Sequence, residues 1–543
     1  MPDYDAIVIG AGAAGGIVAM VLAEAGKTVL LLDRGRDLAY ADVGRDHLRN
    51  HRLAQYGHNT GPDVVGNPRV WVDRAGEPHV VAPHDGRWHN NAMAVGGGTR
   101  VFGAQAWRFL PDDFRMASRY GVPQKSSLAD WPIAYDDLAP FYEQAEWELG
   151  VAGDGEHPSQ APRGRGYPMP PVDVTQSRRV LDRGAAKLGL KTFAPPLLIN
   201  TVPRDGRAAC CRCAMCVGFA CPTDAKNGSH NVPVPRALRT GRCTLVTEAQ
   251  VERVTPRSPA APATIAYFTA DGARRTATAR AIVVSCGAIE SARLLLNSAT
   301  DAHPRGLGND SDQVGRHLQG HYYPSAFGQF DEVTYDGIGP GVSVATCDYN
   351  HGNPGDIVGG GMLANDFIMV PIVFQKWAWP PDVPRWGLAA KRWMRDNFRR
   401  VFDVKGPVQE IPNPESRVTV DLPVRDRFGI PVARLSGEVH PETLRTAGFL
   451  RDRAIDWLQA SGAKRVWSRP IVPFLSGGQH QAGTCRMGSD PRTSVCDPFG
   501  RVHGTDDVFV VDGSLHVTNG GFNPVLTIMA LAFRNAAHVT TTL

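Results

Sequence analysis

Short, uninterrupted apolar runs mark two buried strands near the start of the chain. Residues 6–9 and 29–32 each consist of consecutive apolar residues, a pattern typical of parallel strands buried on both faces. A glycine-rich turn and an apolar segment of helical length lie between them. This order predicts a strand–turn–helix–strand unit of the Rossmann type.

The turn after the first run carries glycines with the spacing G-x-G-x-x-G. Gly10 permits the tight turn, Gly12 lets the backbone approach a pyrophosphate, and Gly15 packs helix against strand. The helix N-terminus offers N–H groups and the positive end of its dipole to phosphate oxygens. Asp33 closes the second strand, where an acid accepts hydrogen bonds from a ribose hydroxyl. Together these features predict a dinucleotide site without distinguishing NAD from FAD.

Further elements of the same sheet lie much later in the chain. Residues 243–254 have strand character, and residues 277–298 are typical of an apolar strand, a turn and a helix. The nucleotide-binding domain is therefore predicted to be discontinuous, with insertions that form a second domain. We expect the first domain to comprise residues 1–120, 205–305 and 475–543, and the second to comprise residues 121–204 and 306–474.

Residues 417–439 follow a different pattern, in which polar and apolar positions alternate on either side of a turn at 426–429. This period is typical of an antiparallel hairpin with one exposed face, and it predicts an antiparallel sheet that supports a substrate site. The predicted fold class is α/β: a discontinuous Rossmann-type domain plus a substrate domain with an antiparallel sheet backed by helices (α+β).

Tryptophans concentrate in one segment, residues 374–400, which holds four of the 11 in the chain. Tryptophan rings stack well on sugars and other ligands. The alternative interpretation is a Pro-kinked insertion whose helix packs these rings into the domain.

Composition and charge exclude several classes of protein. A chain of 543 residues is too long for a single core. The formal net charge of +4, without a long basic run, argues against a nucleic-acid partner. No segment approaches the roughly 18 consecutive apolar residues of a membrane span, and the N-terminus lacks a signal-peptide pattern. We expect a cytoplasmic protein with no membrane span, and the patterning predicts no oligomeric state.

The candidate chemistry lies near the C-terminus. His480 occupies a glycine- and glutamine-rich loop, and Asn523 opens an apolar helix. A strand–turn signal, residues 508–511 followed by Asp512-Gly513, lies between them. The helix N-terminus at 523–525 can point at a second part of the cofactor, and its dipole favours negative charge there.

Five ordered segments of the chain resemble the glucose–methanol–choline (GMC) family of flavoprotein oxidoreductases. They are the N-terminal fingerprint, VGGG at 95–98, SCGAIESARLLL at 285–296, H-x-x-G-T-C-R-M-G at 480–488 and VDGS…NP at 511–524. The resemblance implies FAD as the cofactor and the fold of the family. Besides the fingerprint glycines and Asp33, it implies a set of cofactor-binding residues: Arg34, Gly96, Gly97, Gly98, Thr99, Val251, Cys286, Gly287, Asp512, Gly513, Asn523, Pro524 and Val525.

The resemblance also assigns roles to the C-terminal pair. In this family a histidine at the position of His480 acts near flavin N5, usually as general base. The position of Asn523 is histidine in many members and asparagine in those that resemble cholesterol oxidase and pyranose oxidase. Histidine, with an unperturbed pKa near ~6.5, is suited to accept the hydroxyl proton, and Asn523 can donate a hydrogen bond to the developing alkoxide. Residues 99–103 contain no histidine for covalent flavin attachment, so FAD should be non-covalent.

The resemblance implies oxidation of a CH–OH group by hydride transfer to flavin N5. The local likeness to sugar-oxidising members (pyranose oxidase-like and glycoside 3-oxidase-like) favours a secondary hydroxyl of a pyranose or glycoside, which becomes a ketone. Sterols or other cyclic and aliphatic alcohols are the alternative. The electron acceptor is open among dioxygen, a quinone and another protein. Two further hypotheses are a non-enzymatic flavin electron-transfer subunit and an NAD-dependent dehydrogenase.

Half of the ten cysteines lie in one interval of the chain: Cys210, Cys211, Cys213, Cys216 and Cys221. Some sugar-oxidising relatives carry an iron–sulfur cluster in this interval and pass its electrons to a cytochrome subunit. Cys213-x-x-Cys216 and Cys221 followed by proline fit that resemblance, with Cys211 as a further ligand, although the spacing from Cys216 to Cys221 departs from it by one residue. Zinc would lack a distant second ligand pair. We favour thiols or a disulfide that shape a loop near the flavin, and so no metal.

Overall fold

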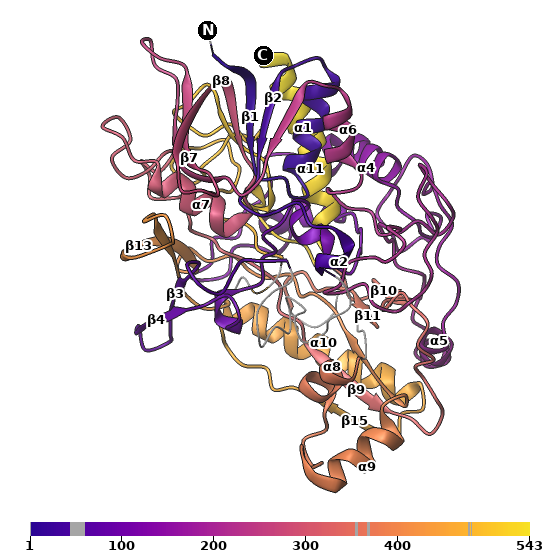
Figure 1. The fold of residues 1–543 in the computed structure, drawn as a ribbon. Coiled ribbons are helices and arrows are strands. Elements are labelled where there is room, and N and C mark those ends of the chain that lie inside the picture. The colour runs from indigo at the N-terminus through magenta and orange to yellow at the C-terminus, as the bar shows by residue number, and fades with distance from the viewer. Residues whose placement is uncertain (1, 44–59, 353–356, 366–369, 476–477, 479) are drawn as a thin grey trace.

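A computed structural model describes residues 2–43, 60–352, 357–365, 370–475, 478 and 480–543. Residues 477 and 479, in the predicted loop before His480, lie outside this description. Figure 1 shows a sheet with its helices at the end of the molecule that holds both termini, and a second sheet at the opposite end.

A seven-stranded sheet contains the predicted Rossmann unit. The strands β5, β2, β1, β8 and β16 pair in parallel, whereas β7 and β6 continue the sheet antiparallel. β8 is long enough to pair with β7 along its first half and with β16 along its second. The strands are β1 (Tyr4–Ile9), β2 (Val29–Leu32), β5 (Cys243–Val246), β6 (Gln250–Thr255), β7 (Ala263–Phe268), β8 (Arg274–Val284) and β16 (Val508–Val510). Since these strands come from three distant parts of the chain, the prediction of a discontinuous Rossmann-type fold is confirmed.

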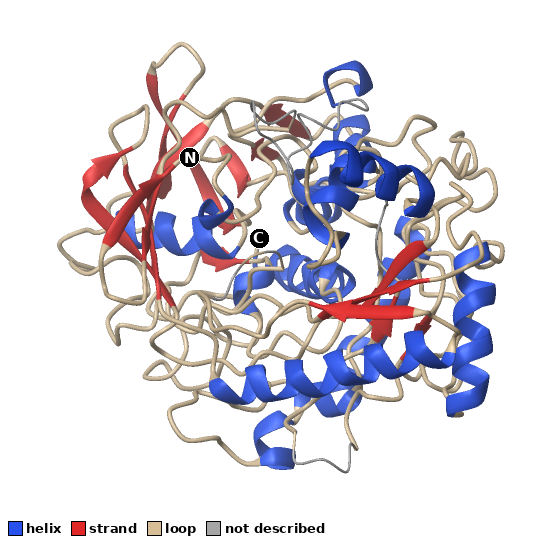
Figure 2. Cartoon of the chain, turned by 90° about the horizontal axis from the view of Figure 1, so that it is seen from below, coloured by secondary structure: helices blue, strands red, loops and turns tan. Residues whose placement is uncertain are grey.

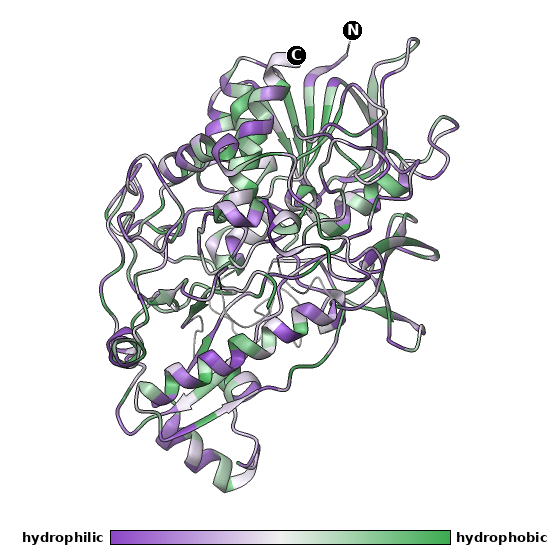
Figure 3. Ribbon diagram, turned by 180° about the vertical axis from the view of Figure 1, so that it is seen from behind, coloured by the Kyte–Doolittle hydropathy of each residue, from purple (hydrophilic) through white to green (hydrophobic). Residues whose placement is uncertain are grey.

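Helices cover this sheet because its central strands are apolar on both faces. Every residue from Ala6 to Ile9 and from Val29 to Leu32 is buried. α6 and α11 both pack on α1, α4 packs on α11, and α7 lies between β6 and a separate hairpin. Figure 3 shows hydrophobic residues concentrated in these strands and in the helices beside them. The helices are α1 (Gly15–Glu24), α4 (Tyr135–Leu149), α6 (Pro233–Arg239), α7 (Ala288–Asn297) and α11 (Val525–Thr542).

The second sheet is antiparallel throughout, in the order β10-β11-β12-β9-β15. The long helix α10 packs on β9, β12 and β15, and α5 packs on α10; Figure 2 shows these helices alongside the strands. The predicted antiparallel sheet backed by helices is therefore confirmed. Its elements are β9 (Ser325–Gln329), β10 (Ala345–Thr346), β11 (Leu363–Ala364), β12 (Val401–Lys405), β15 (Arg465–Ser468), α5 (Gln176–Leu188) and α10 (Pro441–Ala460).

The predicted hairpin at 417–439 is present, but it belongs to a third sheet. β13 (Arg417–Arg425) and β14 (Pro431–Ser436) pair antiparallel, and β14 pairs in parallel with β3 (Arg69–Val72), which continues to β4 (Pro78–Val81). This sheet is separate from the five-stranded antiparallel sheet, and the hairpin packs on α7 beside the Rossmann-type sheet.

The tryptophan-rich segment forms a π-helical turn (Phe374–Ala378) and α9 (Gly387–Asn397). Trp379 and Trp393 pack with their ring centroids 4.9 Å apart, and both contact Phe374. Trp386 instead is 85% exposed. For Trp379 and Trp393 the packing interpretation therefore holds.

The remaining short helices are α2 (Tyr40–Val43), α3 (Met116–Tyr120), α8 (Pro371–Val373) and 3-10 turns at Gly86–Trp88, Gly97–Arg100, Pro111–Phe114 and Gly513–Leu515.

Candidate active site

A cavity of about 380 Å³ lies at the carboxyl ends of the parallel strands, within the size range of small-molecule and cofactor sites. It begins at the glycine fingerprint and reaches the N-terminus of α11. All but two of the residues predicted for the site line it: Gly10, Gly12, Asp33, Arg34, Gly97, Gly98, Thr99, Val251, Cys286, Gly287, His480, Asp512, Gly513, Asn523, Pro524 and Val525.

The two predicted residues outside the lining, Gly15 and Gly96, are enclosed by neighbouring atoms. A Cβ added at Gly15 would lie 1.8 Å from the carbonyl oxygen of Gly10, so only glycine lets α1 approach the turn. At Gly96, φ is +95° and an added Cβ would lie 2.8 Å from Cβ of His230. Both glycines thus shape the backbone behind the cavity.

Asp33 is anchored in the cavity wall by backbone donors. The N–H of Ala11 donates to Oδ2 at 2.9 Å, and the N–H of Gly35 donates to Oδ1 at 2.7 Å. Burial raises the pKa of Asp33, while these two hydrogen bonds oppose the shift. A carboxylate has lone pairs left after two such bonds, so Asp33 can still accept from a ribose hydroxyl.

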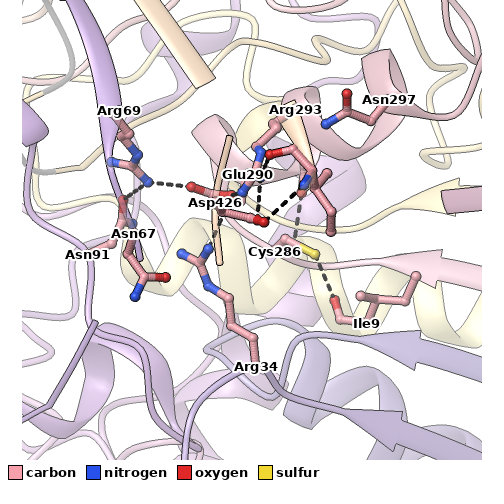
Figure 4. Close-up of polar contacts among 12 residues, drawn as sticks. Ile9, Arg34, Asn67, Arg69, Asn91, Cys286, Glu290, Arg293, Asn297 and Asp426 are labelled. Atoms are coloured by element: carbon pink, nitrogen blue, oxygen red, sulfur yellow. Dashed lines mark hydrogen bonds and ion pairs between the residues drawn. The ribbon is translucent and has the colours of Figure 1, made fainter. Parts of the chain in front are cut away.

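A buried charge cluster next to Arg34 had not been predicted from the sequence. Glu290 Oε1 accepts from Arg69 Nη2 at 2.6 Å, and Glu290 Oε2 lies 3.1 Å from Arg293 Nη1 and 3.2 Å from Arg34 Nη1 (Figure 4). Arg293 also donates to Asp426 at 2.7 Å. Burial would raise the pKa of Glu290, but the three arginines hold it well below its usual range. The cluster joins α7, β3 and the hairpin loop, and it holds Arg34 at the cavity.

Asp512 fastens the end of β16 to the start of α7. Its Oδ2 accepts from the N–H of Gly287 at 2.9 Å and from Ser291 Oγ at 2.6 Å. Its Oδ1 accepts from the N–H and the hydroxyl of Ser514 at 2.8 and 2.6 Å. The carboxylate therefore fixes the two chain segments that line this side of the cavity.

At the other end of the cavity, His480 and Asn523 come together although they are 43 positions apart in sequence. Asn523 Nδ2 lies 3.5 Å from His480 Nε2 and donates to the Tyr323 hydroxyl at 3.2 Å. His480 Nδ1 lies 3.0 Å from Nδ1 of His321 and 3.4 Å from the Tyr323 hydroxyl. Sequence reasoning missed His321 and Tyr323, since no local motif sets residues 321–323 apart.

The N-terminus of α11 faces the same space. Asn523 and Pro524 directly precede the helix, and Val525 is its first residue; all three line the cavity. The first turn carries no acidic side chain. Its N–H groups and the positive end of the helix dipole therefore offer a site for negative charge.

Two protein-family models match the sequence of this chain. The models of the two parts of the GMC oxidoreductases match residues 4–323 and 412–532. The chain is a GMC oxidoreductase. It is therefore an FAD-dependent enzyme that acts on CH–OH groups.

Individual relatives cover nearly the whole of this GMC oxidoreductase. It is 32% identical to 6'''-hydroxyparomomycin C oxidase of Streptomyces lividus, across 98% of this chain and 90% of the relative. It is 28% identical to the fructose dehydrogenase large subunit of Gluconobacter japonicus, across 98% and 97%. The crystal structure of pyridoxine 4-oxidase from Mesorbium loti has the same fold, with a TM-score of 0.60, 19% identity and 98% of both chains covered.

The cavity of this GMC oxidoreductase fits FAD at the positions where backbone must approach the cofactor. A Cβ added at Gly12 or Gly98 would have no described neighbour within 4 Å, although both residues line the cavity. The fingerprint turn and α1 can hold the pyrophosphate, Asp33 the ribose, and Val251 the adenine. The glycine loop and the residues from Asp512 to Val525 then remain for the flavin.

The cysteine interval forms part of the wall behind this cavity. Lys226 Nζ donates to the carbonyl oxygens of Phe102, Cys216 and Phe219 at 3.0, 2.7 and 2.8 Å, and Phe102 and Val217 line the cavity. Burial lowers the pKa of Lys226 to about 8 and raises that of Cys216 to about 12. The interval therefore ties the glycine loop to the chain that precedes α6.

Neither a disulfide nor a metal arrangement occurs in this interval. The described residues include all ten cysteines and form no disulfide, and no group of three or more His, Cys, Asp or Glu among them could hold a metal ion. The iron–sulfur and zinc hypotheses stay predicted alternatives to plain thiols.

Two other expectations concern the tryptophan-rich segment and a membrane span. Among the described residues that line the cavity there is no tryptophan. Of the helices in the described part of the chain, none combines the length and the apolar character that a membrane crossing requires.

Proposed function

We propose that this GMC oxidoreductase oxidises a secondary hydroxyl group of a pyranose sugar or glycoside to a ketone, with His480 as general base and Asn523 as its partner. The observation that carries the proposal is the 3.5 Å approach of His480 Nε2 and Asn523 Nδ2. This pair lies at one end of a cavity whose other end is the nucleotide fingerprint. A base and a hydrogen-bond donor therefore face the same reacting oxygen.

The two side chains have complementary tasks. An alcohol oxygen beside them accepts a hydrogen bond from Asn523 Nδ2 and passes its proton to His480 Nε2. The Tyr323 hydroxyl, which Asn523 contacts at 3.2 Å, holds the amide in place. FAD, bound without a covalent link, supplies the acceptor for the hydride. Loss of one proton and one hydride leaves the carbonyl group.

Two observations support a sugar as the substrate. The two relatives are named for the oxidation of a hydroxyparomomycin and of fructose. In addition, Asn91 and Gln481, whose side chains are hydrogen-bonded at 3.1 Å, both line the cavity, and Gln481 directly follows His480 in the chain. Amide groups both donate and accept, which suits the several hydroxyls of a sugar.

An anaerobic titration of the purified holoenzyme tests the substrate class. Pyranoses and glycosides are expected to bleach the flavin absorbance, and the product should carry a ketone at a ring carbon by NMR. Bleaching by sterols or aliphatic alcohols alone would overturn the sugar proposal. Admission of air, or addition of a quinone, then identifies the acceptor that restores the colour.

A further inference from the structure

His321 is the neighbour through which the protein can control the protonation of His480. Its side chain is only 5% exposed. Its Nε2 lies 2.8 Å from the carbonyl oxygen of Gly520 and 3.1 Å from that of Asn519. Because carbonyl oxygens only accept hydrogen bonds, Nε2 of His321 must carry the hydrogen.

The other ring nitrogen of His321 is consequently an acceptor. Burial lowers the pKa of His321 to about 4, so the ring is neutral near pH 7. A neutral imidazole with its hydrogen on Nε2 has a lone pair on Nδ1. Besides His480 and Tyr323, which contact the ring directly, Asp113 and His516 act on it electrostatically.

The contact between the two histidines then fixes the tautomer of His480. The two Nδ1 atoms are 3.0 Å apart and share one hydrogen. Since Nδ1 of His321 accepts, Nδ1 of His480 donates, and Nε2 of His480 keeps its lone pair. On its far side that Nε2 faces the amide nitrogen of Asn523, which is a donor.

Backbone contacts hold the two histidines in this arrangement. Gln319 and Ala482 exchange both of their N–H···O=C hydrogen bonds, at 3.0 and 2.9 Å. Asn519 Nδ2 donates to the carbonyl oxygens of Gly320 and His480 at 3.1 and 2.8 Å. These hydrogen bonds hold the segment with His321 against the loop with His480.

We propose that His321 is a positioning residue: the relay from the Gly520 carbonyl through His321 to Nδ1 of His480 holds His480 in the tautomer whose Nε2 takes the substrate proton. This inference rests on the proposed function, in which Nε2 is the accepting atom. After the proton has arrived, Nδ1–H of His480 still donates to His321. The relay therefore also stabilises the charged form of the base.

Two substitutions of His321 separate this relay from simple packing. His321→Asn keeps an acceptor oxygen close to the place of Nδ1, whereas His321→Leu fills similar space without one. The Leu variant is expected to reduce its flavin at least about tenfold more slowly, as part of a base contribution of about 10²–10⁴-fold. The acidic limb of its rate–pH profile should shift to lower pH, because loss of the relay lowers the pKa of His480, and the Asn variant should stay close to wild type in both rate and profile. Identical profiles in the two variants and wild type would overturn the proposal.

A spectroscopic measurement covers the outcome in which a variant does not fold. ¹⁵N-histidine NMR of the wild-type holoenzyme, with His480 assigned from His480→Asn, is expected to show hydrogen on Nδ1 and none on Nε2 in the neutral ring. Hydrogen on Nε2 would overturn the relay. This readout needs no substrate. If no alcohol reduces the wild-type flavin, the proposed function fails while the NMR result still decides the tautomer.

Discussion

At the scale of single residues, Glu290 is the clearest case of a side chain whose charge is needed where it lies. It is the common partner of Arg34, Arg69 and Arg293. Arg69 and Arg293 are almost fully enclosed, and burial lowers the pKa of Arg69 to about 10. Removing one partner of a buried ion pair costs about 3–5 kcal/mol, because the other charges are left without compensation.

Glu290→Gln should therefore lower the free energy of unfolding by about 3 kcal/mol and weaken FAD retention, since Arg34 lines the cavity. Urea unfolding and the flavin content of the purified protein measure the two effects. The matched control is Glu438→Gln, which breaks the exposed ion pair with Arg74 and should change stability by less than about 1 kcal/mol. Equal stability of the two variants would contradict this account of the cluster.

At the scale of elements, the turn between β1 and α1 is built from glycines with different duties. The backbone of Gly15 lies against the carbonyl group of Gly10, because a Cβ added at Gly15 would lie 1.8 Å from the Gly10 carbonyl oxygen. At Gly12 an added Cβ would meet no described atom within 4 Å. One glycine is needed for packing, and the other keeps cavity space open.

Two alanine substitutions should separate these duties. Gly15→Ala is expected to destabilise the apoprotein by about 3 kcal/mol, because backbone must move to admit the methyl group. Gly12→Ala should leave the apoprotein within about 1 kcal/mol of wild type but bind FAD more weakly. Unfolding of both apoproteins and a fluorescence titration with FAD measure the two properties. A Gly12→Ala variant that binds FAD with wild-type affinity would contradict the assignment of the fingerprint.

Local periodicity was sufficient to predict the elements but not their long-range partners. The buried runs at 6–9 and 29–32 and the hairpin at 417–439 could be read from residue order, since hydrophobic periods of two and continuous runs are local. The pairing of β14 with β3 could not, because the register depends on a strand some hundreds of residues away. His321 and Glu290 were missed for the same reason: their importance comes from neighbours that only the fold brings close.

At the scale of the whole molecule, several buried or partly buried histidines are held neutral in different parts of the fold. Burial lowers the pKa of His89 and of His230 to about 3, and that of His321 and of His516 to about 4. In the unfolded chain the same groups titrate near ~6.5. Below that pH the unfolded chain therefore binds protons that the folded protein does not.

Stability is consequently expected to be full above about pH 6.5 and to fall by several kcal/mol as the pH drops toward 4. Urea unfolding at pH 8, 6.5 and 5 measures this dependence. His516→Gln should make the slope shallower by about one proton. A free energy of unfolding that stays constant from pH 8 to pH 5 would show that these histidines are not held neutral.

His480 is expected to take the proton of an alcohol whose oxidation reduces the flavin, and anaerobic stopped-flow reduction of His480→Ala tests this role most directly. The matched control is His538→Ala, since His538 stacks on Phe499 with ring centroids 4.1 Å apart and does not line the cavity. With equal FAD content, the rate of bleaching by the best alcohol of the panel should fall by roughly 10²–10⁴-fold in His480→Ala and stay unchanged in His538→Ala. Bleaching of His480→Ala at the wild-type rate would contradict the account.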